Sequence, residues 1–191
     1  MGGAVIGPQK FHAPLLMYRK DFGGVFAPRS AWSILVYGLP PLATRMVNQQ
    51  KSASKVAQFL QAHPKVACVH YPGLETFPQY ELARRQMTSY AGKFAPGGMV
   101  YFVLKGEEHE AAEAADRFMD HIANHAYSVT LAVSLGQIRT LIEEPYSMTH
   151  SALPPEVKYA RGLKPGGIRL SMGLEDWHDI INDLQTALEQ I

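Results

Sequence analysis

The strongest constraint on the fold of this chain is a pair of adjacent prolines, Pro40 and Pro41. Proline lacks an amide donor and restricts the backbone of the residue before it, so any helix that reaches Leu39 must end there. The residues before this break form only short pieces, whereas those after it show regular apolar periodicity. We therefore predict two parts, an incomplete one over residues 1–43 and a domain over residues 44–191.

The short pieces before the prolines are a strand-like apolar run over residues 4–6 and a helical run over residues 30–36. In the second part, apolar residues three and four positions apart predict helices, and continuous apolar runs predict strands. Helices alternating with about four short strands indicate an α/β domain, an α+β sandwich whose small sheet is covered on one side. The helices are expected over residues 44–63, 79–87, 107–121 and 176–191, and the strands over 66–71, 99–104, 127–133 and 168–172.

The composition excludes several classes of protein. Hydrophobic residues make up 47% of the 191 residues, enough for a core, and the formal net charge is only +1. A nearly neutral chain is a poor partner for nucleic acid or an acidic membrane surface, and no apolar run approaches the ~18 residues that span a bilayer. The single cysteine, Cys68, excludes a disulfide framework. We expect a cytoplasmic protein that binds neither nucleic acid nor membrane.

The tetrapeptide Ser52-Ala53-Ser54-Lys55 matches the Ser-x-x-Lys pattern, in which a serine nucleophile is activated by a lysine or a lysine carries a cofactor. Either role requires the reactive group at the edge between a strand and a helix, facing a pocket. Here the four residues lie inside an amphipathic helical repeat. We therefore interpret them as a solvated helix face.

The histidines of this chain give little support for a metal site. His121 and His125 have the spacing that lets two side chains share a metal on one helix face. No glutamate lies between them to serve as a base, and the helix is expected to end close by. We predict no metal site, and we interpret His70 and His150 as hydrogen-bonded structural residues.

Two polar residues occur where the pattern is otherwise apolar. Ser134 directly follows the run that ends at Val133, and Arg169 lies inside a predicted strand, where a lone charge needs a partner. A guanidinium is suited to bidentate binding of a carboxylate, with a serine hydroxyl as a natural companion. A structural salt bridge from Arg169 to Glu175 or Asp176 fits the pattern equally well.

Five motifs follow one another along the chain: His70-Tyr71-Pro72-Gly73-Leu74, Pro78-Gln79-Tyr80-Glu81-Leu82-Ala83, Ala132-Val133-Ser134-Leu135-Gly136, Ser147-Met148-Thr149-His150-Ser151 and Ile168-Arg169-Leu170-Ser171-Met172-Gly173-Leu174-Glu175-Asp176. In this order they resemble the C-terminal half of the Cys/Met-metabolism family of pyridoxal-phosphate enzymes. That family includes methionine γ-lyase, cystathionine γ- and β-lyases, cystathionine γ-synthase and the O-acetylhomoserine sulfhydrylases. The resemblance extends from Gly3 to Ile191, with departures at residues 37–41 and 137–139 that leave the substrate open.

The resemblance implies an aspartate-aminotransferase-like fold, known as fold type I. In that fold a large domain holds pyridoxal 5'-phosphate, and a C-terminal α/β domain closes over the substrate. Residues 1–43 would then be the end of the large domain, and residues 44–191 the C-terminal domain. By the same resemblance, Arg169 would bind the α-carboxylate of an amino-acid substrate, with Ser134 beside it.

The resemblance also implies that the lysine that forms the Schiff base precedes this chain, together with the other cofactor-binding residues. We therefore expect a fragment of a C–S lyase or sulfhydrylase acting on sulfur amino acids, inactive alone and without catalytic or cofactor-binding residues of its own. Its expected partner is a second copy, as a homo-oligomer, or a complementing N-terminal half. The alternative is a non-catalytic module that binds an amino acid or oligomerises through aromatic residues, namely Tyr18, Phe22, Phe26, Trp32 and Tyr37.

Overall fold

The structure is a computed structural model that describes residues 5–191, and the chain divides into two compact units, Met1–Ala43 and Thr44–Ile191. The described part of the first unit consists of short helices joined by turns. The helix before the two prolines ends at Gly38, which confirms the predicted break. The helical elements of this unit are η1 (Gln9–Phe11), α1 (His12–Phe22), α2 (Pro28–Ser33) and the π-helix η2 (Ile34–Gly38).

Helix α1 is an element that the sequence pattern does not predict. Its apolar residues include the consecutive run Leu15-Leu16-Met17-Tyr18, so they surround the helix instead of forming one stripe. The helix ends at Gly23, whose φ of 81° is readily adopted only by glycine. The expected strand at residues 4–6 is not formed by residues 5 and 6, and Ala4 lies outside the described residues.

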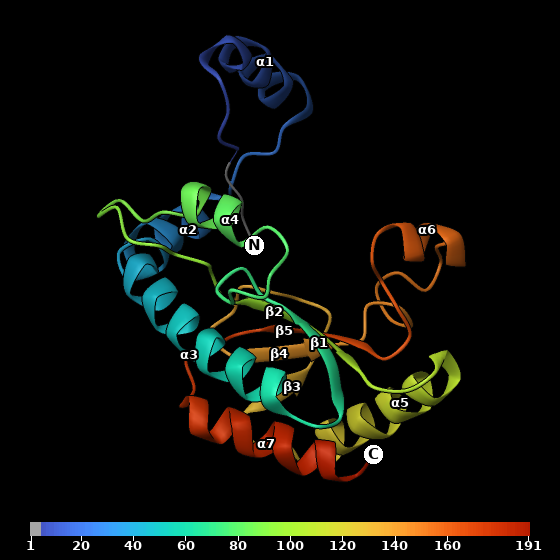
Figure 1. Cartoon of the computed structure of the whole chain (residues 1–191). Helices are drawn as coiled ribbons and strands as arrows, with labels where there is room; N and C mark the ends of the chain where they lie inside the picture. The colour runs from blue at the N-terminus through green and yellow to red at the C-terminus, as the bar shows by residue number, and fades with distance from the viewer. Residues whose placement is uncertain (1–4) are drawn as a thin grey trace. The chain divides into compact units, whose positions relative to one another are not determined.

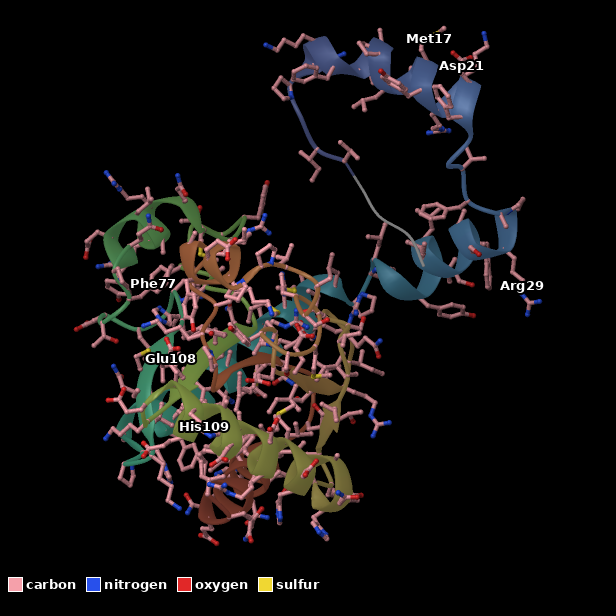
Figure 2. The ribbon with its side chains drawn as sticks, turned by 90° about the vertical axis from the view of Figure 1, so that its right-hand side faces the viewer. Met17, Asp21, Arg29, Phe77, Glu108 and His109 are labelled. Atoms are coloured by element: carbon pink, nitrogen blue, oxygen red, sulfur yellow. The ribbon has the colours of Figure 1, made fainter. Side chains whose placement is uncertain are left out.

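None of residues 5–43 has a buried side chain. Figure 2 shows Met17 and Asp21 projecting from α1, and Met17 is 52% exposed. Since burial of apolar surface is the main favourable term in folding, this segment gains little stability from a core of its own. All five aromatic residues named above are exposed: Tyr18, Phe22, Phe26, Trp32 and Tyr37.

The second unit is built around a five-stranded sheet with the order β1-β2-β5-β4-β3 (Figure 1). Neighbouring strands are antiparallel except β3 and β4, which are parallel. The strands are β1 (Val66–His70), β2 (Met99–Leu104), β3 (Val129–Leu131), β4 (Thr140–Glu143) and β5 (Gly167–Ser171).

Three long helices lie on one side of this sheet: α3 (Leu42–Ala62), α5 (Glu108–His125) and α7 (Trp177–Glu189) (Figure 1). Their apolar faces form one core with the sheet, in which Leu60, Phe118 and Leu184 pack with strand residues such as Phe102 and Leu170. All five of these side chains are fully buried. The predicted α/β domain is confirmed.

Two further elements of the second unit differ from the sequence prediction. Strand β4 is a fifth strand that the sequence analysis did not predict. Its four residues are all buried, but the run is short and its last residue is the charged Glu143. Helix α6 (Pro155–Ala160) begins at Pro155, because proline is favoured in the first turn of a helix. The remaining short helix, α4 (Tyr80–Gln86), lies inside its predicted range.

A buried carboxylate fixes the start of β3 against α7. Asp183 on α7 accepts hydrogen bonds from the backbone amides of Tyr127, Ser128 and Val129, at 3.2, 2.6 and 3.0 Å. Without this carboxylate, amides that lie in or next to the core would lose their acceptor, which is costly in a buried position. Asp183 therefore provides hydrogen-bond acceptors for the backbone amides of this turn, as strand pairing does for the amides of the sheet.

We expect Asp183→Ala to lower the free energy of unfolding by about 3 kcal/mol, because it leaves buried amides without an acceptor. Asp183→Asn keeps one carbonyl acceptor and should lose roughly half as much. Urea denaturation followed by circular dichroism measures both changes. Asp120→Ala, at an exposed position of α5, is the matched control and should change stability by less than about 0.5 kcal/mol.

Candidate functional site

A row of polar side chains crosses the sheet on the face opposite to the three long helices. Residues paired directly across neighbouring strands share a face, and the pairs His70–Tyr101, Tyr101–Arg169 and Arg169–Glu143 continue from β1 to β4. Burial raises the pKa of the Tyr101 hydroxyl, which accepts a hydrogen bond from the amide of Lys164. The row places one guanidinium near the centre of the sheet.

The guanidinium of Arg169 pairs with Glu143. Its Nη1 lies 2.5 Å from Oε1 of Glu143, whose side chain is fully buried, while the Arg169 side chain is 20% exposed. The predicted alternatives, Glu175 and Asp176, are wrong as partners, since Glu175 binds Thr140 and Asp176 caps α7. Sequence analysis missed Glu143 because it did not predict β4, the strand that places Glu143 opposite Arg169.

The backbone carbonyl of Ser134, and not its hydroxyl, contacts Arg169. Nη2 of Arg169 donates to the carbonyl oxygens of Val133 and Ser134, at 3.1 and 3.0 Å. The Ser134 side chain is exposed on the same segment. The structure thus brings the two predicted site residues together, and the arginine holds the segment that carries the serine.

The segment that carries Ser134 is fixed at three further points. The amide of Gly136 donates to Oγ of Ser171 on β5, and Nε2 of the buried Gln49 donates to the carbonyl of Gln137. The amide of Leu174 donates to the carbonyl of Ile138. Gly136 has φ of 74°, which lets the chain turn between these contacts. An exposed segment is thereby held in one conformation next to Arg169.

Glu175 anchors the first residue of β4. Its carboxylate accepts from the amide and the hydroxyl of Thr140, and that hydroxyl accepts from the amide of Gly173. A Cβ atom at Gly173 would collide with the backbone of Arg139 and Thr140. These contacts give a physical reason for the Ser-Met-Gly-Leu-Glu-Asp part of the fifth motif, which holds β4 beside Arg169.

The motif at residues 147–151 borders the same place. The hydroxyl of Thr149 donates to Oε1 of Glu143 at 3.3 Å and lies 2.9 Å from Nδ1 of His150. His150 and Arg169 line an open cleft of about 300 Å³ together with apolar residues that include Met99 and Leu163. The cleft therefore combines one guanidinium with an apolar wall, an arrangement that can bind the carboxylate of a small molecule with an apolar side chain.

Of the other residues singled out by the sequence, His70 also lines this cleft, whereas Ser52, Lys55, His121 and His125 do not. Ser52 is buried, which corrects the prediction of a solvated face there, and Nζ of the exposed Lys55 lies 5.9 Å from the ring centre of Trp177. His121 and His125 both lie within α5, so the expected helix end between them is wrong, and their rings are 4.8 Å apart. The described part of the chain contains no group of three potential metal ligands.

Comparisons with known proteins agree with this architecture. The model of a family described as Cys/Met metabolism PLP-dependent enzyme matches residues 1–189. The L-methionine gamma-lyase of Porphyromonas gingivalis is 39% identical over 100% of this chain and 45% of its own length, and the O-succinylhomoserine sulfhydrylase of Mycobacterium tuberculosis is 35% identical over 98% and 44%. A crystal structure of cystathionine gamma synthase from Xanthomonas oryzae pv. oryzae, in complex with cystathionine, matches with a TM-score of 0.81 and 33% identity, over 96% of this chain and 43% of the other.

The chain therefore spans less than half the length of each of these relatives. The matched structure contains, within 43% of its length, an arrangement of helices and strands similar to the one this chain adopts. Among residues 5–191, no helix is both long enough and apolar enough to cross a membrane.

We expect Arg169→Met to lower the free energy of unfolding by about 3 kcal/mol, because it leaves the Glu143 carboxylate buried without its cation. The double variant Arg169→Met/Glu143→Met removes both charges and should recover most of that loss. Urea denaturation of the wild type, both single variants and the double variant gives the coupling energy directly. Simple addition of the two single losses would contradict the pairing.

We also expect the thiol of Cys68 to react slowly. Although the residue is exposed, partial desolvation of the thiol raises its pKa, and the nearby charge of Lys164 only partly opposes this effect. At pH 8 the folded protein should be alkylated by iodoacetamide about threefold or more slowly than the urea-unfolded chain, because only the thiolate reacts. Cys68 is the only cysteine, so intact mass reports this one site. Equal rates in the folded and unfolded states would contradict the raised pKa.

Proposed function

Because the chain belongs to the Cys/Met-metabolism family of PLP-dependent enzymes, we propose that it forms the substrate-binding C-terminal part of a C–S lyase or sulfhydrylase. In this proposal it acts in the cytoplasm on an amino acid that carries sulfur or another leaving group on its side chain. The proposal is supported by relatives whose names describe such reactions, an L-methionine gamma-lyase and an O-succinylhomoserine sulfhydrylase.

The observation that carries the proposal is the position of Arg169 on the open face of the sheet. Its guanidinium borders the cleft that Met99, His150 and Leu163 also line, and Ser134 lies on the segment that it binds. In this arrangement Arg169 binds the α-carboxylate of the substrate, and the Ser134 hydroxyl donates a second hydrogen bond. The apolar wall faces the substrate side chain and excludes water from it.

In this proposal the described residues do not hold PLP by themselves. A PLP enzyme of this kind needs a lysine amino group that reaches the cofactor, and no lysine is among the described residues that line the cleft. The buried Lys158 is engaged instead with the carbonyls of Tyr146 and Ser151. We therefore assign the cofactor to polypeptide that corresponds to the remaining length of the relatives, and we derive no step through it.

Exposed apolar surface supports a polypeptide partner. On the segment next to Arg169, Val133, Leu135 and Ile138 are 53%, 58% and 58% exposed, and residues 5–43 have no buried side chain. Apolar surface of this extent favours association. The proposed partner is the complementing N-terminal half, followed by assembly of the complete units into a homo-oligomer.

A stand-alone module that binds an amino acid is the second candidate, and the same exposed arginine favours it. Its weakness is energetic. Charge-assisted hydrogen bonds contribute about 1.5–3 kcal/mol each, whereas millimolar affinity already requires about 4 kcal/mol after the costs of association. Because Glu143 and two carbonyls already engage the Arg169 guanidinium, the net gain from a carboxylate is smaller still.

The proposal is tested by co-expressing this chain with the N-terminal part of the P. gingivalis L-methionine gamma-lyase that precedes the matched region. We expect the mixed complex to bind PLP, seen as a single-site adduct after borohydride reduction and mass analysis, and to release a keto acid from L-methionine. Arg169→Lys should lower kcat/KM by about 10- to 100-fold, because it loses the bidentate contact. Lys55→Ala serves as the control and should leave the rate unchanged.

The chain alone should give no stoichiometric PLP adduct. An adduct on Lys55 of the isolated chain would overturn the assignment of the cofactor to another polypeptide. A mixed complex that binds PLP and remains fully active with Arg169→Lys would overturn the role given to the arginine. A stable monomer that binds L-methionine at millimolar concentration without a partner would favour the second candidate.

A further inference from the structure

The buried carboxylate of Glu143 is the feature that the proposed reaction leaves unexplained. Its side chain is fully buried, and its Oε2 atom has no hydrogen-bond partner among the described residues. Burying an ion pair rarely increases stability, since two apolar side chains of similar size usually do as well or better. A charge kept at this cost points to a role in fixing the geometry of its partner.

Arg169 shows what that geometry is. A guanidinium has five N–H donors in one plane. Nη1 faces Glu143 on β4, while Nη2 faces the carbonyls of Val133 and Ser134. These contacts lie on two sides of the group, so they fix both its plane and its rotation about the side-chain axis. Nε, which is buried, has no partner within residues 5–191.

The carbonyl contacts alone would not hold the group in place. Both come from one exposed segment and reach a single nitrogen, so the guanidinium could still turn about that point. Glu143 instead sits on a core strand in direct register with Arg169, and its Oε1 is itself held by the Thr149 hydroxyl. The rigid contact is therefore the one to Glu143.

We propose that Glu143 is a positioning residue that holds the Arg169 guanidinium in the orientation required to bind a substrate carboxylate at the cleft. This rests on the proposed function of Arg169. Glu143 touches neither substrate nor cofactor, and its contribution is to prevent the arginine from rotating away from the incoming carboxylate. Loss of Glu143 leaves the positive charge in place but removes its fixed direction.

The test is nuclear magnetic resonance of this chain labelled with 15N and 13C in arginine, with rotation rates measured on the chain alone and L-norleucine added to its mixed complex with the N-terminal part. In the wild type we expect slow rotation about the Cζ–Nη bonds of Arg169, and a shift of its Nε–Hε signal when L-norleucine is added. L-Norleucine carries an α-carboxylate but no leaving group, and L-norleucinamide, which lacks the carboxylate, is the control ligand. The Arg169 signal is assigned as the one that disappears in Arg169→Lys.

In Glu143→Met the Nη rotation should become at least tenfold faster, and L-norleucine should bind at least threefold more weakly. Glu143→Gln retains an acceptor and should fall between this variant and the wild type, and it replaces Glu143→Met if that variant does not fold. Asp183→Asn alters a buried carboxylate on α7 that does not contact Arg169, so it should leave both readouts unchanged.

Slow rotation that persists in both Glu143 variants would overturn the inference. If L-norleucine fails to shift the Arg169 signal of the wild type, the carboxylate-binding role in the proposed function is contradicted instead. The rotation rates still report on Glu143 in that case. Faster rotation without any change in L-norleucine affinity would show that Glu143 orders the arginine without serving ligand binding, and would also overturn the inference.

Discussion

The guanidinium of Arg169 links three parts of the second unit. It lies on β5, pairs with Glu143 on β4 and holds the carbonyls of residues 133 and 134 in the segment between β3 and β4. The sheet supplies the fixed points, because β5 is its central strand and pairs on both sides. The contacts of Arg169 thereby fix the arrangement of polar groups on this face of the sheet.

Carboxylates elsewhere in the unit do a related task for the backbone. Asp183 binds three consecutive amides at the start of β3, and Glu175 binds the amide at the start of β4. Glu144 accepts from the amide of Gly166, just before β5. In each case a side chain satisfies amides that strand pairing does not reach, so the loops end at fixed positions without forming longer strands.

The sequence predicted the main elements of the second unit because their apolar periodicity is strong. Helix α7 and strand β2 lie within or match their expected ranges, since both have continuous apolar faces that pack in the core. Strand β4 could not be predicted in this way, because its four buried residues, which end in a glutamate, show no clear hydrophobic periodicity. The partner of Arg169 was missed for the same reason, as only the pairing of β4 with β5 identifies Glu143.

The first unit was harder to predict for a different reason. Its helices have no buried side in the described residues, so no apolar stripe could mark α1 in the sequence. The two prolines, which act through local backbone geometry, correctly predicted that the helix before them ends, and that helix ends at Gly38. Among the predicted site residues, Ser134 and Arg169 were placed by motif resemblance, and their mutual contact depends on a backbone carbonyl that no side-chain pattern can reveal.

The edges of the sheet are unsuited to pairing with another chain. On one edge β3 has only three residues, and on the other β1 is interrupted by a bulge between Val66 and Cys68. Short or irregular edge strands offer a poor template for backbone hydrogen bonding, which is the usual route to fibrous aggregates. A unit with such edges can present a broad apolar surface to a partner and still resist polymerisation through its own backbone, so its association is governed by side chains.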